Sequence, residues 1–116
     1  MHELSIVEAL IDQVAAELAR TNCAGRVLRV ELSIGRLSGV SAESVRFAFG
    51  MLAPGTVAEG AEIVIDQPPA VCRCQACRAD TQIDDLVVEC PRCRSGEISI
   101  DGGRDLILQS IEVMEN

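Results

Sequence analysis

The chain has 116 residues, a formal net charge of −8 and 48% apolar residues, yet its only aromatic residues are Phe47 and Phe49. This length fits one ordinary domain, or one domain carrying a small insert, with a core built from aliphatic side chains. The acidic balance disfavours nucleic-acid phosphates and anionic membranes as partners, and favours cations or basic proteins. All ten basic residues are arginines, which excludes lysine Schiff-base chemistry and a phosphate-binding P-loop.

The first predicted element is an amphipathic helix over residues 4–20. Its apolar side chains recur at spacings of three and four, at Leu4, Val7, Leu10, Ile11, Val14 and Leu18. The acidic residues within this segment do not fit a secretory signal. The apolar runs of the chain are far shorter than the roughly 20 residues needed to cross a bilayer. We therefore expect a cytoplasmic protein that does not associate with membranes.

Strands and a second helix are predicted downstream. Residues 27–34 predict a half-buried strand, with one face formed by Leu28, Val30, Leu32 and Ile34 and a polar face formed by Arg29, Glu31 and Ser33. Gly35 and Gly39 bracket a turn, and Ser41 is a candidate N-cap for a helix over roughly 42–53, which Pro54-Gly55 would end. Residues 61–66 predict another short strand.

The character of the chain changes after Pro68-Pro69, since residues 72–93 hold five of the six cysteines. Beyond them, Asp101-Gly102-Gly103 is a tight-turn signal that leads into a last strand near 105–114. We therefore expect an α+β fold, in which a small mixed sheet packs with two helices. Residues 1–68 and 98–116 would form this domain, and residues 69–97 an inserted zinc-ribbon-like module.

The cysteine module contains two CxxC pairs, Cys74 with Cys77 and Cys90 with Cys93, separated by twelve residues. Each pair can present two thiolates at the spacing that a tetrahedral zinc ion requires. The loop between the pairs is shorter than is usual for zinc modules, but the pattern predicts a structural zinc site with four cysteine ligands. A metal-free thiol cluster, or disulfides in an exported protein, are the alternatives.

The remaining cysteines are weaker candidates. Cys72 could replace one of the ligands, but we favour a spectator role, and Cys23 is expected to be a small, partly buried side chain. The module has a net charge of −1 over residues 70–97 and no aromatic residue for base stacking. Nucleic-acid binding is therefore not expected.

The only histidine, His2, follows the first methionine directly. The amine of Met1, the amide of His2 and its imidazole can close two adjacent chelate rings on one metal ion. Such a set of nitrogens suits the square-planar preference of Ni(II) or Cu(II) better than tetrahedral zinc. Glu3 adds a carboxylate and a further amide nitrogen. A solvated terminal histidine without a ligand role is the alternative.

Several segments together resemble the HypA family of hydrogenase maturation nickel metallochaperones. They are Met1-His2-Glu3-Leu4-Ser5, residues 31–39, Arg46-Phe47-Ala48-Phe49, Gly60-Ala61, the two CxxC pairs and Ser110-Ile111-Glu112-Val113. The resemblance implies a nickel-binding α/β domain with an inserted zinc domain. It implies His2 as the essential nickel ligand, Glu3 as its neighbour, and Cys74, Cys77, Cys90 and Cys93 as zinc ligands.

Two positions depart from the family pattern. The family has glycine after each CxxC pair, where this chain has Arg78 and Arg94. A non-glycine residue in a left-handed turn costs about 1–2 kcal/mol, so strained knuckles are expected. Some members offer a carboxylate to nickel near position 40. This chain has Val40 there, and Glu43 is only a loose substitute.

The resemblance implies a carrier and not an enzyme, with transferable Ni(II) and structural Zn(II). Its implied partners are a HypB-like GTPase and the precursor of the nickel–iron hydrogenase large subunit, and some relatives also serve urease. The sequence leaves the oligomeric state open, and strand exchange through linkers at 67–70 and 101–104 is one route to a homodimer. The alternatives are a zinc-ribbon scaffold without a second metal, and a zinc hydrolase, which four thiolate ligands disfavour because they leave no open position.

Overall fold

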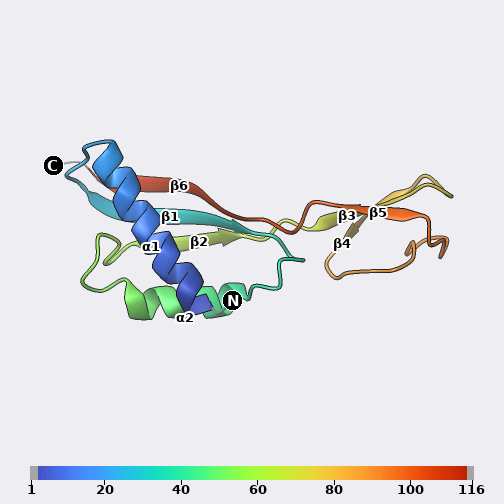
Figure 1. The fold of residues 1–116 in the computed structure, drawn as a ribbon, viewed down its shortest axis with the longest axis horizontal. Coiled ribbons are helices and arrows are strands. Elements are labelled where there is room, and N and C mark those ends of the chain that lie inside the picture. The colour runs from blue at the N-terminus through green and yellow to red at the C-terminus, as the bar shows by residue number, and fades with distance from the viewer. Residues whose placement is uncertain (1–2, 115–116) are drawn as a thin grey trace. The chain divides into compact units, whose positions relative to one another are not determined.

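The computed structural model describes residues 3–114. Two helices and six strands follow one another along this part of the chain (Figure 1). They are α1 (Glu3–Arg20), β1 (Arg26–Ile34), α2 (Ala42–Leu52), β2 (Glu62–Asp66), β3 (Ala70–Cys74), β4 (Asp80–Ile83), β5 (Ile98–Asp101) and β6 (Leu106–Met114). Neither described helix has the length and apolarity that a bilayer-spanning helix needs.

The strands form two separate three-stranded sheets. The first has the order β2-β1-β6 and the second the order β4-β3-β5. The described chain divides into two compact units accordingly, one made of residues 3–32, 41–65 and 108–114, the other of residues 33–40 and 66–107. The predicted α+β fold, with helices, small sheets and a cysteine module, is confirmed. The predicted boundaries, residues 1–68 with 98–116 and residues 69–97, describe domains that would fold independently. That property is not tested by this division, so the boundaries stay a prediction.

The first unit is built on the apolar stripe of α1. Five residues of this helix are buried, among them Val7 and Val14, which are fully inaccessible. The helix packs against α2, whose Val45 is also fully buried. The helix ends at Arg20. Beyond it, Asn22 adopts a left-handed φ of 54°, and the amide of Cys23 donates to the carbonyl of Leu18 at 2.9 Å. This is the hydrogen-bond pattern of a Schellman cap.

The second helix begins as predicted. The Oγ atom of Ser41 accepts a hydrogen bond from the amide of Ser44 at 3.2 Å, so Ser41 is the N-cap of α2. An amide of the first helical turn has no carbonyl partner within the helix, and the side-chain oxygen of the cap accepts its hydrogen bond. This is why a serine suits the position.

The alternation predicted for β1 is only partly correct. Val30, Leu32 and Ile34 are buried as expected, but Leu28 is only half-buried. Val27 and Ser33 are also buried, on the face that was expected to be polar. β1 is the central strand of its sheet, between β2 and β6. Neighbours on both sides help to cover a central strand, and this explains the burial that alternation alone does not predict.

The second unit contains the cysteines and a small apolar cluster. β3 pairs antiparallel with β4 and with β5, and Cys72 lies opposite Thr81 on one side and Ile100 on the other. Ala70, Cys72 and Ile83 are buried in the cluster, and Leu37, Val87, Ile98 and Ile100 pack against it.

The turn predicted at Asp101-Gly102-Gly103 is present and leads into the last strand, β6. Both glycines have positive φ, 73° and 71°, as a tight bend requires. The strands that flank them do not pair with each other, because β5 belongs to the sheet of β3 and β6 to the sheet of β1. The bend therefore carries the chain from one sheet to the other and does not close a hairpin.

Candidate metal centre

The two CxxC segments form two short loops in the second unit. Cys74 is the last residue of β3, and its amide donates to the carbonyl of Ala79 at 3.1 Å, which closes the first loop. The amide of Cys90 donates to the carbonyl of Ser95 at 2.8 Å and closes the second loop in the same way. Each loop is thereby folded around its own pair of thiols.

Backbone amides point at the first sulfur of each pair. The amide of Cys77 donates to Sγ of Cys74 at 3.4 Å, and the amide of Arg92 donates to Sγ of Cys90 at 3.4 Å. Amides directed at sulfur favour its thiolate form, since the negative charge strengthens such hydrogen bonds.

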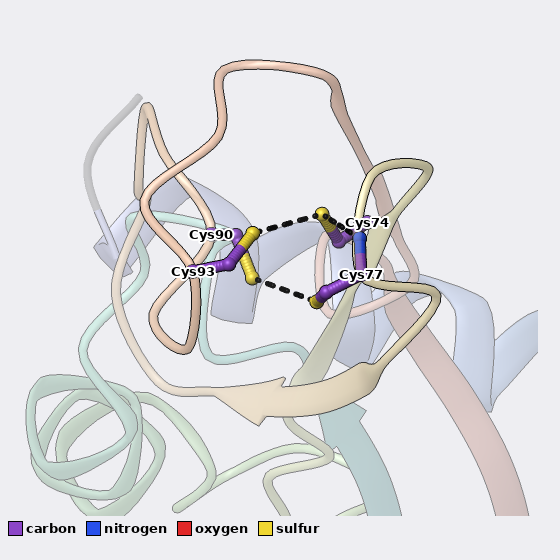
Figure 2. A group of neighbouring side chains, drawn as sticks. All are labelled: Cys74, Cys77, Cys90 and Cys93. Atoms are coloured by element: carbon purple, nitrogen blue, oxygen red, sulfur yellow. Dashed lines mark hydrogen bonds between the residues drawn. The ribbon is translucent and has the colours of Figure 1, made fainter.

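The four sulfur atoms of the pairs converge on one point (Figure 2). All of them lie within 4.8 Å of one another. Sγ of Cys74 is 3.6 Å from Sγ of Cys93, and Sγ of Cys77 is 3.7 Å from Sγ of Cys90. The chain thus brings together the four cysteines that the spacing singled out, two from each loop.

The electrostatics of this cluster favour the binding of a cation. Hydrogen bonds from the amides of Cys93 and Arg92 lower the pKa of the Cys90 thiol to about 6. The amide of Ser95 also favours the thiolate of Cys93, but the neighbouring sulfurs of Cys74, Cys77 and Cys90 raise the pKa of Cys93 to about 12. Without a positive ion, the last thiol stays protonated because its ionised neighbours repel a further negative charge.

A tetrahedral zinc ion fits this donor set. Zinc–sulfur bonds of about 2.3 Å place neighbouring sulfurs of a tetrahedron about 3.8 Å apart. The separations of 3.6 and 3.7 Å lie close to that value. Four thiolates complete the coordination of a tetrahedral ion, so the centre suits a resident structural metal and offers no open position for hydrolysis.

The residues after the CxxC pairs adopt the conformation expected for glycine. Arg78 has a φ of 63° and Arg94 a φ of 65°. The predicted strain at both knuckles is therefore present, at a cost of about 1–2 kcal/mol for each residue. The carbonyl of Cys90 accepts from the amide of Arg94 at 2.9 Å, so the strained residue takes part in closing its loop.

The other two cysteines, Cys72 and Cys23, are not among the four converging sulfurs. Cys72 is 1% exposed within the apolar cluster of the second unit and does not belong to the group of four converging sulfurs. Burial raises the pKa of its thiol, and the nearby thiols of Cys90 and Cys74 raise it further. Cys23 is partly buried after α1, where its Sγ accepts from the amide of Gly25 at 3.4 Å.

Of the predicted nickel ligands Met1, His2 and Glu3, the structure describes only Glu3. Met1 and His2 lie outside the described residues, so their ligand roles stay a prediction. Glu3 is the first residue of α1, and its carboxylate accepts a hydrogen bond from the amide of Ser41 at 3.2 Å. This bond ties the beginning of α1 to the N-cap of α2. Glu43 is exposed in the first turn of α2.

Two features of the structure, the hydrogen bond of Glu3 with Ser41 and the burial of Leu37, could not be predicted from the sequence. The bond between Glu3 and Ser41 joins residues 38 positions apart, and neither residue type signals the other. Leu37, expected only as part of a turn, packs onto the buried cluster of the cysteine unit. A single apolar residue between glycines gives no periodicity from which its burial could be inferred.

Comparison with known proteins points to one family over the whole length of the chain. The family model described as "Hydrogenase/urease nickel incorporation, metallochaperone, hypA" matches residues 1–113. The hydrogenase maturation factor HypA of Chlorobium limicola is 47% identical over 115 residues, which cover 99% of this chain and 98% of that protein. HypA of Desulfitobacterium hafniense is 36% identical, with 99% and 100% covered.

A solved structure has the same fold. The solution structure of the nickel metallochaperone HypA from Helicobacter pylori superposes with a TM-score of 0.66, covers all of both chains, and is 27% identical in sequence. A second solution structure of a HypA protein gives a TM-score of 0.68 at 24% identity, and supports the likeness of fold alone.

Proposed function

This chain belongs to the HypA family of hydrogenase maturation nickel metallochaperones, and we propose that it carries one Ni(II) ion at its N-terminus. The ligands in this proposal are the amine of Met1, the amide and imidazole of His2, and Glu3. The match of the family model from residue 1 onward carries the proposal. The residues support it, because the only histidine of the chain stands at position 2, where amine, amide and imidazole can chelate one ion.

Glu3 contributes by position as well as by chemistry. Its carboxylate accepts a hydrogen bond from the amide of Ser41, which holds the first residue of α1 at the N-cap of α2. A nickel ion held by residues at a chain end can be presented to a partner and removed by it.

The resident metal in this proposal is Zn(II), held by Cys74, Cys77, Cys90 and Cys93. The convergence of their sulfur atoms within 4.8 Å supports it. When bound, zinc would cross-link the two loops, and its binding free energy would contribute to folding of the second unit. The role is structural, since the thiolates supply every ligand that a tetrahedral ion takes.

The delivery step follows from family membership. We propose that the nickel passes to the large-subunit precursor of a nickel–iron hydrogenase with the help of a HypB-like GTPase, and that urease is a second destination in organisms that contain it. The acidic charge of −8 favours a basic docking surface on such partners. Thiolate ligation requires reduced cysteines, which the cytoplasm maintains, so we place the delivery there.

Metal analysis of the untagged protein tests the proposal. After exposure to zinc and nickel, we expect two ions per chain, one of each metal. His2→Ala should lose nickel and keep zinc and the fold, and an N-terminal tag should weaken nickel binding where a C-terminal tag does not. Glu3→Gln retains an oxygen for the Ser41 amide and should weaken nickel less than Glu3→Ala. A single ion per chain under excess nickel would instead indicate a zinc-ribbon scaffold.

The zinc site has its own matched pair of variants. Cys77→Ser removes one of the four converging sulfurs and should release zinc and loosen the two loops. Cys23→Ser alters a cysteine of the first unit and should leave the zinc content unchanged. Equal zinc contents in the two variants would contradict the assignment.

A further inference from the structure

β6 forms one edge of the sheet β2-β1-β6 (Figure 1). Within residues 3–114 it pairs with β1 and with no other strand, and none of its nine residues is buried. The outer side of such a strand presents a row of amide and carbonyl groups to which another strand can add. β6 can therefore accept a further strand without giving up its pairing with β1.

β6 also lacks the features that usually protect an edge strand. Short length, proline and charged side chains discourage the addition of another strand. β2, the opposite edge of the same sheet, has five residues and carries Glu62 and Asp66 at its two ends. β6 has nine residues without proline or glycine, and its one charged side chain, Glu112, forms an ion pair with Arg29. Of the two edges, β6 is the one open to pairing.

A groove lies between α1 and β6. It has a volume of about 430 Å³ and is lined by Gln13, Glu17 and Leu18 from α1 and by Ile111 and Val113 from β6. These residues all belong to the first unit, and the two β6 side chains remain partly exposed. Because alternate side chains of a strand point to the same face, a strand added to β6 would direct every second side chain toward the groove face. The groove offers space and apolar surface to such side chains.

Charge complementarity selects the kind of strand that fits. The chain has a net charge of −8, so two copies repel each other unless the surfaces that meet are nearly neutral. In the groove, the carboxylate of Glu17 is paired with Arg20. A nearly neutral edge beside an apolar groove is matched by a strand that is itself nearly neutral and carries apolar side chains. Among the described strands, β6 has the lowest density of charged residues, one in nine.

We propose that this edge is a self-association surface, and that two copies of the chain pair antiparallel through β6 about a two-fold axis at Ser110. Ser110 is the midpoint of β6, so this register pairs the strand over its whole length. The two three-stranded sheets become one six-stranded sheet, and the same surface serves both copies, as a two-fold axis requires. The inference depends on neither metal site.

The side-chain neighbours in this register are compatible. Gln109 comes to lie opposite Ile111 of the partner subunit, on the groove face, and Leu108 opposite Glu112 of the partner subunit, on the other face. Ser110 meets its own copy with a small, uncharged side chain. No like charges stand opposite each other, which would destabilise the pair. A register centred on Glu112 would instead bring two carboxylates together.

Sedimentation of the untagged, zinc-loaded protein from micromolar to millimolar concentration tests the inference, and we expect a reversible dimer. Gln109 is exposed and lines the groove. Gln109→Glu keeps the size of the side chain but buries one carboxylate from each copy in the dimer. It should raise the dissociation constant about tenfold for each carboxylate, about a hundredfold in total. Gln82→Glu is the matched control, because Gln82 is exposed on β4, an edge strand of the other sheet, and should leave the dissociation constant unchanged.

Amide hydrogen exchange locates the interface. As the protein concentration rises, the outward-facing amides of β6 should become more protected, while those of β2 should not change. A dimer formed by strand exchange through residues 67–70 and 101–104 would leave Gln109→Glu as dimeric as the parent protein, and this result would overturn the inference. So would a parent protein that stays monomeric at millimolar concentration, or a dimer in which the protection of β6 does not rise.

Discussion

Replacement of Gly35 by alanine should loosen the packing of residues 33–40 against residues 66–107, the other segment of the second unit. A Cβ atom at position 35 would lie 2.2 Å from the carbonyl carbon and oxygen of Gly103 and 2.6 Å from the amide nitrogen of Arg104. All three are backbone atoms, which cannot rotate away as a side chain can. The chain around 35–38 or around 102–105 must therefore shift by about 1 Å or more to restore ordinary van der Waals contact.

The size of the effect follows from what the two segments share. The amide of Gly35 donates to the carbonyl of Asp105 at 2.8 Å, and the amide of Leu37 donates to the carbonyl of Gly103 at 2.6 Å. Loss of two such bonds costs about 2 kcal/mol. Partial withdrawal of the Leu37 side chain from its apolar cluster adds about 1 kcal/mol. We expect Gly35→Ala to destabilise this junction by about 3 kcal/mol.

Amide hydrogen exchange of the zinc-loaded protein measures this loss of stability at the junction directly. A loss of about 3 kcal/mol should reduce the protection of the Leu37 amide more than a hundredfold. Gly50→Ala is the matched control, because Gly50 lies exposed in α2 with no heavy atom within 4 Å of an added Cβ. It should stabilise the helix by about 0.5–1 kcal/mol. Unchanged protection of Leu37 in Gly35→Ala would refute the reasoning.

Three further predictions concern the capping serine and two of the cysteines. Ser41→Ala removes the acceptor of the Ser44 amide and should destabilise the first unit by about 1 kcal/mol in denaturant unfolding, whereas Ser41→Asp restores an acceptor and most of the stability. Cys72→Ala should keep the full zinc content and lower stability by about 1 kcal/mol, through loss of a buried sulfur from the apolar cluster; loss of zinc would show that Cys72 is a ligand. In metal-free protein, Cys90 should react with a neutral alkylating reagent from about pH 6 upward, since its thiolate is stabilised by amides in the folded loop. Because folding lowers the pKa of this thiol, its ionisation stabilises the folded loop at a pH above the ordinary thiol pKa, and this stabilisation is lost as the pH falls through about 6. Unfolding in urea should restore an ordinary thiol pKa. Reactivity with the same pH dependence in folded and unfolded protein would contradict the prediction.

Local patterns in the sequence were sufficient for the elements that depend on neighbours within a few residues. The apolar spacing of α1 and the Ser41 cap of α2 are of this kind. So are the two cysteine loops and the left-handed conformation of Arg78 and Arg94, because the loop closes within one turn and its geometry follows from the CxxC spacing.

Other features depended on residues that meet only after folding. β5 leads into β6 through the predicted turn, and its pairing with β3 and not with β6 is a choice between strand partners that local alternation does not encode. The same holds for the contact of Gly35 with Gly103, in which two glycines 68 positions apart allow two backbone segments to touch.

The residues that could bind metals were recognisable before folding was considered, since donor chemistry and short spacing are properties of consecutive residues. The convergence of four sulfur atoms within 4.8 Å, the hydrogen bond between Glu3 and Ser41, and the burial of Leu37 against the apolar cluster became visible only in the folded chain. Each of these arrangements arises from the packing of segments that are remote in the sequence. No single stretch of sequence contains that information.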